Sequence, residues 1–108
     1  MENRNLKEMI NGWFIGSFEP TVLSTDSCEV AVKYYFKGDS EKEHFHKIAT
    51  EVTLIISGEV EMFNKIWKQG DIIKIEPGES TAFEAITDAI TVVVKTPGVL
   101  NDKYLSNL

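Results

Sequence analysis

The sequence predicts an all-β protein, folded as a small antiparallel β-barrel or sandwich with a short helical segment near its N-terminus. Short runs of apolar, β-branched and aromatic residues recur along the chain, and several of them alternate with a period of two. Glycine, proline or polar turn residues separate these runs at even spacing. The length of 108 residues fits one domain covering residues 1–108.

The expected elements follow one another without a linker or a repeat. The helical segment spans residues 3–10, where Leu6, Met9 and Ile10 lie on one side of one or two turns. The expected strands occupy residues 13–18, 28–37, 51–57, 59–64, 71–76, 81–86 and 89–95. The turns between them include GDSEKE (38–43), KQGD (68–71) and PGES (77–80).

The strand at residues 28–37 alternates an apolar set with a charged set. Val30, Val32 and Tyr34 share one face, and Lys33 lies on the other. We expect the apolar set to face the interior. Tyr34 is then either a core residue with a bonded hydroxyl or a residue that lines a pocket.

The run VTLII at residues 52–56 is apolar on both of its faces. One face would form the barrel interior, so the other needs cover from the N-terminal segment or from a second subunit. Val52, Leu54 and Ile56 would together make a contiguous apolar patch if they faced water. We therefore expect a homodimer.

The composition limits the partners and the location. The net charge is −6 and the pI is near 4.9, so the chain lacks the basic stripe that a phosphate backbone requires, and we expect no nucleic-acid partner. We also expect no membrane partner, because no apolar run is long enough to cross a bilayer and the N-terminus does not read as a signal peptide. With Cys28 as the only cysteine, a cytoplasmic location is expected.

The two histidines of the chain are only one residue apart. Because side chains two apart in a strand point the same way, His44 and His46 are expected to face one side together. Glu51 lies on the following strand, where antiparallel pairing can return it to their side. Two imidazoles and one carboxylate on one face form a facial ligand set with open positions, which suits Fe(II) and also Zn, Mn or Ni.

The glycines around this cluster complete a wider spacing, which resembles the first signature motif of the cupin family. That spacing is Gly38-x5-His44-x-His46-x4-Glu51-x6-Gly58. Downstream, the stretch GDIIKIEPGEST at residues 70–81 is similar to the second cupin motif, but only in part. The resemblance covers about residues 28–96 and implies a small β-barrel, or jelly roll.

The departures from the second motif concern the metal. Thr81 stands where cupins carry their third histidine, and Ala85 stands at the asparagine position. The resemblance therefore implies a divalent metal, of unknown identity, that is held by His44, His46 and Glu51 alone. The residues expected to line the pocket are Thr53, Thr81, Phe83 and Tyr34.

Three functions remain open at this point, because cupins are not defined by one activity. The first is a metal-dependent enzyme, such as an oxygenase or isomerase, that acts on a small polar or anionic substrate. The second is a metal-free sugar isomerase or epimerase in which His44 and His46 serve as acid and base. The third is a non-catalytic module that binds a small molecule, with carbohydrate among the candidate ligands.

Overall fold

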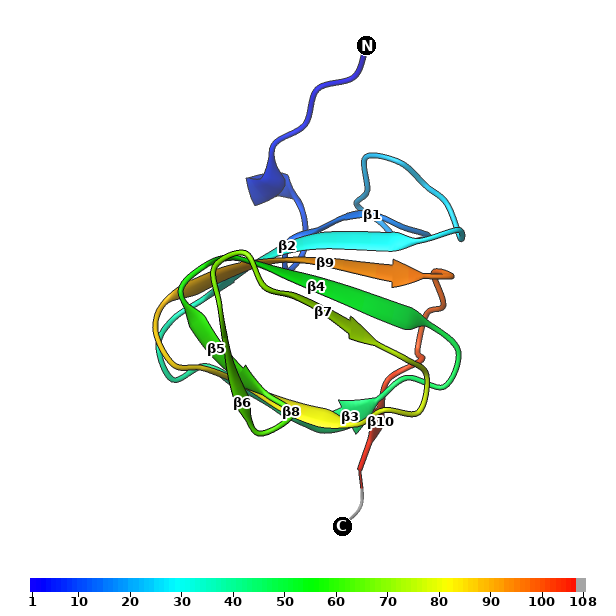
Figure 1. The fold of residues 1–108 in the computed structure, drawn as a ribbon. Helices are drawn as coiled ribbons and strands as arrows, with labels where there is room; N and C mark the ends of the chain where they lie inside the picture. Colours follow the sequence, from blue (N-terminus) through cyan, green and yellow to red (C-terminus); the bar gives the residue numbers. More distant parts are fainter. Residues whose placement is uncertain (107–108) are drawn as a thin grey trace.

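The computed structural model describes residues 1–106, which form two antiparallel β-sheets of five strands each. The sheets face one another and enclose an interior, as the two layers of strands in Figure 1 show. In chain order the elements are the 3-10 turn η1 (Leu6–Glu8) and the strands β1 (Trp13–Ile15), β2 (Glu29–Tyr35), β3 (Ser40–Phe45), β4 (Thr50–Ser57), β5 (Glu59–Met62), β6 (Lys65–Lys68), β7 (Ile72–Ile75), β8 (Thr81–Ala85), β9 (Ala89–Thr96) and β10 (Tyr104–Leu105).

The strand order confirms the predicted β-barrel of jelly-roll type. The first sheet has the order β1-β2-β9-β4-β7, and the second sheet has the order β10-β3-β8-β5-β6. Except for the pairs β1–β2 and β5–β6, strands that follow one another in sequence, such as β3 and β4, lie in different sheets, and the chain crosses from one layer to the other (Figure 1). This crossing places the end of β3 opposite the start of β4.

The N-terminal segment forms the short helical turn that the sequence predicts. Asn5 caps it, since its side chain accepts the Lys7 N–H at 2.9 Å while Glu8 accepts the Asn5 N–H at 2.6 Å. In Figure 1 the turn lies above β2, outside the barrel. No helix within residues 1–106 is long and apolar enough to cross a membrane.

Two glycines end strands in the conformation that the sequence predicts. Gly58, between β4 and β5, has φ +81°, and Gly70, before β7, has φ +90°. A Cβ at Gly58 would also lie 2.1 Å from the carbonyl oxygen of Asp88. The tight crossing from the first sheet to the second therefore requires glycine at position 58.

The apolar core fills one end of the interior. Its buried members come from both sheets: Ile55, Val60, Met62, Ile73, Ile75, Phe83, Ala85 and Ala89. Removing each of the larger side chains from water contributes about 1.5–3 kcal/mol. Trp67 packs against this cluster and donates its indole N–H to the Met62 carbonyl at 2.9 Å, so its polar group is satisfied.

The alternation of β2 is opposite to the prediction. Ala31, Lys33 and Tyr35 face the interior, whereas Tyr34 lies outside the barrel with 68% of its surface exposed. The prediction that Tyr34 lines the pocket was therefore wrong, and the neighbouring Tyr35 lines it instead. It failed because the apolar face of β2 is not the inner face.

Candidate metal and ligand site

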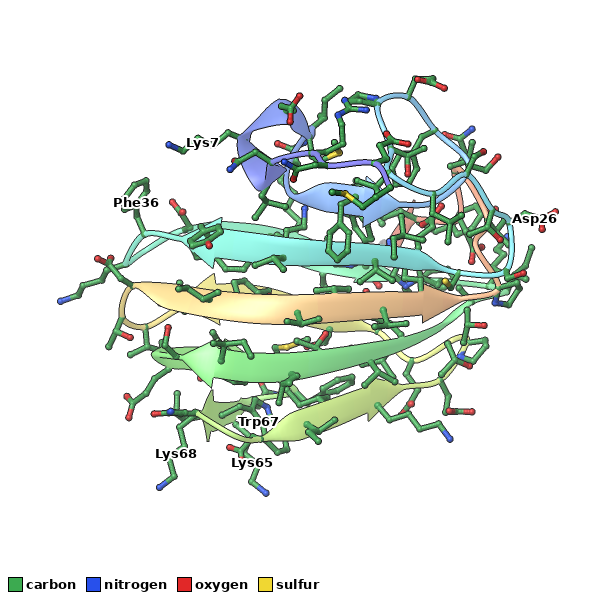
Figure 2. The ribbon with its side chains drawn as sticks, turned by 90° about the horizontal axis from the view of Figure 1, so that it is seen from above. Lys7, Asp26, Phe36, Lys65, Trp67 and Lys68 are labelled. Atoms are coloured by element: carbon green, nitrogen blue, oxygen red, sulfur yellow. The ribbon has the colours of Figure 1, made fainter. Side chains whose placement is uncertain are left out.

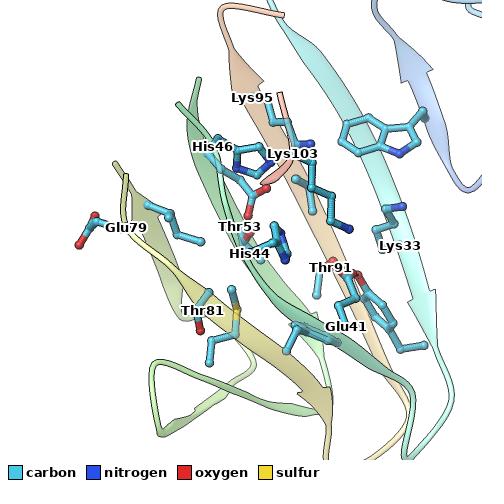
Figure 3. A pocket seen from close by; sticks show the side chains of 17 residues that line it. Lys33, Glu41, His44, His46, Thr53, Glu79, Thr81, Thr91, Lys95 and Lys103 are labelled. Atoms are coloured by element: carbon cyan, nitrogen blue, oxygen red, sulfur yellow. Dashed lines mark hydrogen bonds between the residues drawn. The ribbon is translucent and has the colours of Figure 1, made fainter. Parts of the chain in front are cut away.

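A cavity of about 250 Å³ adjoins the apolar core, and Met62, Ile75 and Phe83 border both. The predicted metal ligands His44, His46 and Glu51 all line it, and so do the predicted pocket residues Thr53, Thr81 and Phe83. Figure 3 shows the side chains of both histidines directed into this space. The cavity has room for roughly eight water molecules at ~30 Å³ each, which is the size of a small metabolite.

The end of β3 brings the two histidines to the same side. His44 pairs with Thr81 of β8, and His46 follows directly after the strand. Phe45 points the other way and stacks on Tyr104 of β10, with ring centroids 5.6 Å apart. The two imidazole rings have centroids 5.5 Å apart at an interplanar angle of 84°.

The His44 ring is held by a hydrogen bond that leaves its second nitrogen free. Its Nδ1 lies 2.9 Å from the carbonyl oxygen of Lys42. A carbonyl can only accept, so Nδ1 must carry the proton, and in the neutral ring Nε2 keeps its lone pair. Metal-binding histidines are commonly oriented by this kind of hydrogen bond.

His46 is buried, with 5% of its surface exposed, and its Nε2 has no hydrogen-bond partner among residues 1–106. Burial lowers the pKa of His46 to about 4, and the nearby charges of Lys95 and His44 act in the same direction. The ring is therefore neutral at pH 7. A buried, neutral and unpartnered nitrogen is unusual unless something binds it.

Glu51 lies on β4, across from Ile75 of β7 and Lys95 of β9. Its carboxylate accepts a hydrogen bond of 3.2 Å from the Thr53 hydroxyl. Burial raises the pKa of Glu51, while Lys95 and the Thr53 hydrogen bond oppose that shift. A bound cation would offset the cost of keeping this carboxylate ionised in a buried position.

The Thr81 hydroxyl, which stands in the place of the missing histidine, is engaged by backbone groups. Its hydroxyl donates to the Ala82 carbonyl at 2.8 Å and accepts the Phe63 N–H at 2.8 Å. Its only proton is thus already used within the backbone. The side chain shapes the cavity wall beside His44 and has no donor left for a bound molecule.

The cavity contains further polar residues that the sequence analysis did not assign to the site. Tyr35 donates its hydroxyl to Glu41 at 3.3 Å, and burial, followed by the Glu41 charge, raises the pKa of this tyrosine. The remaining additions are Trp13, Lys33, Glu79, Thr91, Lys95 and Lys103. The alternation in β2 could have revealed Lys33 and Tyr35 if the inner face had been assigned correctly.

The C-terminal segment closes this end of the barrel and fixes the loop after His46. Asp102, with 5% of its surface exposed, accepts the N–H groups of Lys47 at 3.1 Å, Ile48 at 3.1 Å and Ala49 at 2.9 Å. Burial acts to raise the pKa of Asp102, but these three hydrogen bonds outweigh it and lower the pKa. The carboxylate therefore holds the loop that carries the buried histidine.

The donor atoms of these three side chains are of the kinds that bind a divalent ion, but the side chains are not placed together to hold one. Two imidazoles with a nitrogen free to bind and one carboxylate line a single cavity, which is a sound ligand set for Fe(II), Zn, Mn or Ni. Within residues 1–106, however, no three His, Cys, Asp or Glu side chains are positioned together to hold an ion. Binding therefore requires these side chains to converge.

Comparison with solved structures defines the fold class. An uncharacterized conserved protein with a double-stranded beta-helix domain from Klebsiella pneumoniae is 27% identical, with a TM-score of 0.70 over 81% of this chain and 76% of that one. An RmlC-like cupin from Shewanella frigidimarina is 20% identical, with a TM-score of 0.63 over 72% of each chain. The fold is thus that of the cupins, a double-stranded β-helix, as the motif spacing predicted.

A longer enzyme shares this fold. The DMSP lyase DddQ from Ruegeria pomeroyi is 23% identical, with a TM-score of 0.68 over 87% of this chain. The present chain spans about half of that enzyme, 49% of its length. No protein-family model matches the sequence, and no curated protein does so either.

Proposed function

We propose that this small cupin binds a divalent metal through His44, His46 and Glu51 and receives a small polar or anionic molecule in the adjoining cavity. The observation that carries the proposal is the Nε2 atom of His46, which is buried and unpartnered beside a second imidazole with its own Nε2 free. A protein rarely buries a polar atom in this way without a partner that binds it.

Each of the three side chains would contribute differently. His46 is neutral well below pH 7, so it can donate its lone pair without first losing a proton. His44 is oriented by the Lys42 carbonyl, and Glu51 supplies the negative charge that reduces the cost of burying a cation. A bound metal would act as a Lewis acid toward an oxygen of the ligand.

A second candidate function has its own support. Three lysines line the same cavity, and their positive charges disfavour the binding of a metal ion there. A metal-free protein that binds an anionic ligand is therefore the alternative. A metal-free isomerase or epimerase is less well supported, because His46, with a pKa of about 4, is neutral near pH 7 and can serve only as the base of such a pair.

The experiment compares metal content and thermal unfolding of the wild type, Glu51→Gln and the control Glu79→Gln. Glu79 lies on the cavity rim, where it accepts the Glu76 N–H at 2.7 Å, so its substitution removes a charge without removing a proposed ligand. Saturation with Zn, Mn, Ni or Fe(II) should raise the melting temperature of the wild type and of Glu79→Gln by roughly 10 °C. A chelator should reverse that rise.

Glu51→Gln should lower metal affinity at least about a hundredfold, since losing a ligand costs more than losing a residue that orients one. The metal proposal fails if elemental analysis finds no ion after incubation with each of the four metals and the chelator leaves the wild-type melting curve unchanged. The anion-binding alternative would then replace it.

A further inference from the structure

The charged side chains around the cavity are three carboxylates and three lysines, and they differ in their partners. The carboxylates of Glu41, Glu51 and Glu79 accept hydrogen bonds from Tyr35, from Thr53 and from the Glu76 backbone, respectively. The three lysines, Lys33, Lys95 and Lys103, have no carboxylate within the ion-pair distance of 4.0 Å anywhere in residues 1–106. The acids thus accept hydrogen bonds within the protein, whereas the lysines have no carboxylate partner, although Lys33 and Lys95 lie over the Trp13 ring.

The lysines come from three separate elements and meet at one wall. Lys33 is on β2 and Lys95 on β9, and the ammonium groups of both lie 5.0 Å from the centroid of the Trp13 ring. Lys103 comes from the C-terminal segment just before β10. Figure 3 shows Lys95 and Lys103 close to the histidines and Lys33 further along the same side.

A buried hydroxyl on this wall is also unsatisfied. Thr91 lies directly across from Lys33 in the β2–β9 pairing, and 1% of its surface is exposed. Its hydroxyl lies close enough to the Tyr35 hydroxyl to act on the pKa of that tyrosine, but it has no hydrogen bond of good geometry among residues 1–106, and the residue lines the cavity. A donor that is nine-tenths buried or more and left unpaired indicates that a ligand or an ordered water completes it.

We propose that Lys33, Lys95 and Lys103, together with the Thr91 hydroxyl, form a subsite for the carboxylate group of a small organic acid. The inference rests on the ligand cavity of the proposed function but not on its metal. A carboxylate can accept hydrogen bonds from both an ammonium and a hydroxyl group, and it would balance cations that the protein leaves unpaired. The cavity volume of about 250 Å³ limits the rest of the acid to a small molecule.

The same cations could attract a phosphate, but the surroundings favour a carboxylate. Phosphate sites commonly use arginine forks or the N–H groups at the start of a helix. Arg4 is the only arginine of the chain, and it pairs with Glu2 and Glu8 near the N-terminus. The residues described here include no α-helix, and the apolar side chains Met62, Ile75 and Val93 border the cavity.

The test measures binding of matched acids and amides by titration calorimetry. Benzoate and lactate are compared with benzamide and lactamide, which have nearly the same shape without the charge, and inorganic phosphate is added as a separate probe. All five are titrated into chelator-treated protein and into protein loaded with Zn. The acids should bind at least tenfold more tightly than their amides. This preference should weaken when NaCl is raised from about 20 to about 200 mM, because salt screens the attraction between the lysines and the carboxylate.

Lysine variants identify the subsite. Lys95→Gln and Lys103→Gln should each weaken carboxylate binding about tenfold, whereas Lys95→Arg should largely retain it. Lys74→Gln is the matched control, because Lys74 lies outside the cavity and pairs with Glu76 at 3.2 Å. Circular dichroism and melting curves establish that each variant is folded.

Four results would overturn the inference: no binding of either acid, equal binding of acids and amides, binding that the lysine variants leave unchanged, or tighter binding of phosphate than of both acids. The outcome for the metal is separate. If no metal binds but chelator-treated protein still takes up carboxylates in a lysine-dependent way, the metal proposal fails and the carboxylate subsite stands.

Discussion

The two faces of the first sheet differ, because the inner face is partly polar and the outer face is largely apolar. Toward the cavity, β4 presents Glu51 and Thr53, whereas Val52 and Leu54 lie on the outer face. The strand pairings align one outer row across four neighbouring strands: Val32, Val92, Leu54 and Ile72. Figure 2 looks onto this outer face, where the side chains above the middle strands are largely hydrocarbon.

The outer face departs from the usual pattern of a half-buried sheet, in which apolar residues face the interior and polar residues face water. On the inner face, Ile55 and Ile75 belong to the apolar core, whereas Glu51 and Thr53 border the cavity. Polar side chains in an interior and a broad apolar outer face are the two departures that most often indicate function. We propose that a ligand meets the polar groups of the inner face and that a second copy of the chain covers the outer face.

The largest expected effect concerns the outer face. Leu54→Lys should weaken the proposed homodimer at least about a thousandfold, because each copy would bury an unpaired ammonium group at a cost of ~3–5 kcal/mol. Sedimentation should give the wild type twice the chain mass of 12.2 kDa and the variant a single chain mass. Ile66→Lys on β6 of the second sheet is the control and should stay dimeric. A wild type that is monomeric at micromolar concentration would show that no second copy covers the face.

The next effect concerns the stability of the metal-free protein at low pH. The pKa of His46 is about 4 in the folded chain and near 6.5 when unfolded, so between these values the unfolded chain binds a proton that the folded chain does not. Stability should therefore fall as the pH is lowered from 6.5 to 4, by up to about 3 kcal/mol from this residue.

Burial raises the pKa of Glu29 and of Glu51, so the folded chain keeps these two protons to a higher pH than the unfolded chain does. These shifts lower the free energy of unfolding as the pH rises, whereas the shift of His46 raises it. The contribution of His46 is thus measured as the difference between the wild type and His46→Gln in urea titrations across this range. Parallel pH profiles for the two proteins would contradict the prediction.

A smaller effect is expected at the loop that follows His46. Asp102→Ala removes the acceptor of three backbone N–H groups and should lower the free energy of unfolding by about 2 kcal/mol. It should also broaden or shift the His46 imidazole resonances, because the loop loses its anchor. Asp26→Ala, at an exposed position, should change neither quantity. An unaltered His46 signal in Asp102→Ala would show that the carboxylate does not position this residue.

The smallest expected effect is at Thr91, where a substitution should raise stability and weaken ligand binding, as is typical of a binding residue. Thr91→Val replaces a buried hydroxyl that has no partner within residues 1–106 by a methyl group of similar shape. We expect the free energy of unfolding to rise by up to ~1 kcal/mol, since an unsatisfied polar group is removed, while carboxylate binding weakens. Loss of stability with unchanged binding would contradict the role given to this hydroxyl.

The fold and the histidine cluster could be predicted because they depend on local rules. Turn glycines and period-two alternation marked the strands, and the same period placed His44 and His46 on one side. Alternation separates two faces of a strand but does not say which is the inner one. On β2 the more apolar face is the outer one, so a rule that places apolar residues inside selects Tyr34 where the structure has Tyr35.

The rest of the site depends on contacts between distant segments. Lys33, Lys95 and Lys103 are separated widely in sequence and meet only because β2 pairs with β9 and the C-terminal segment returns beside β3. Asp102 reaches backbone groups more than fifty positions earlier in the chain. Neither juxtaposition has a signal in local spacing or composition, so the sequence alone could not reveal them.

The central claim is that the polar end of the barrel binds an ion through both histidines. The chain has only two histidines, and both are proposed ligands, so long-range ¹H–¹⁵N spectra of the imidazoles observe two of the three proposed ligands without overlap from other histidines. Metal-free protein should show His46 neutral down to about pH 4. One equivalent of Zn should then shift the resonances of both rings together, with Glu51→Gln requiring far more Zn. Imidazole spectra that are unchanged by Zn, or a shift confined to one ring, would contradict the account.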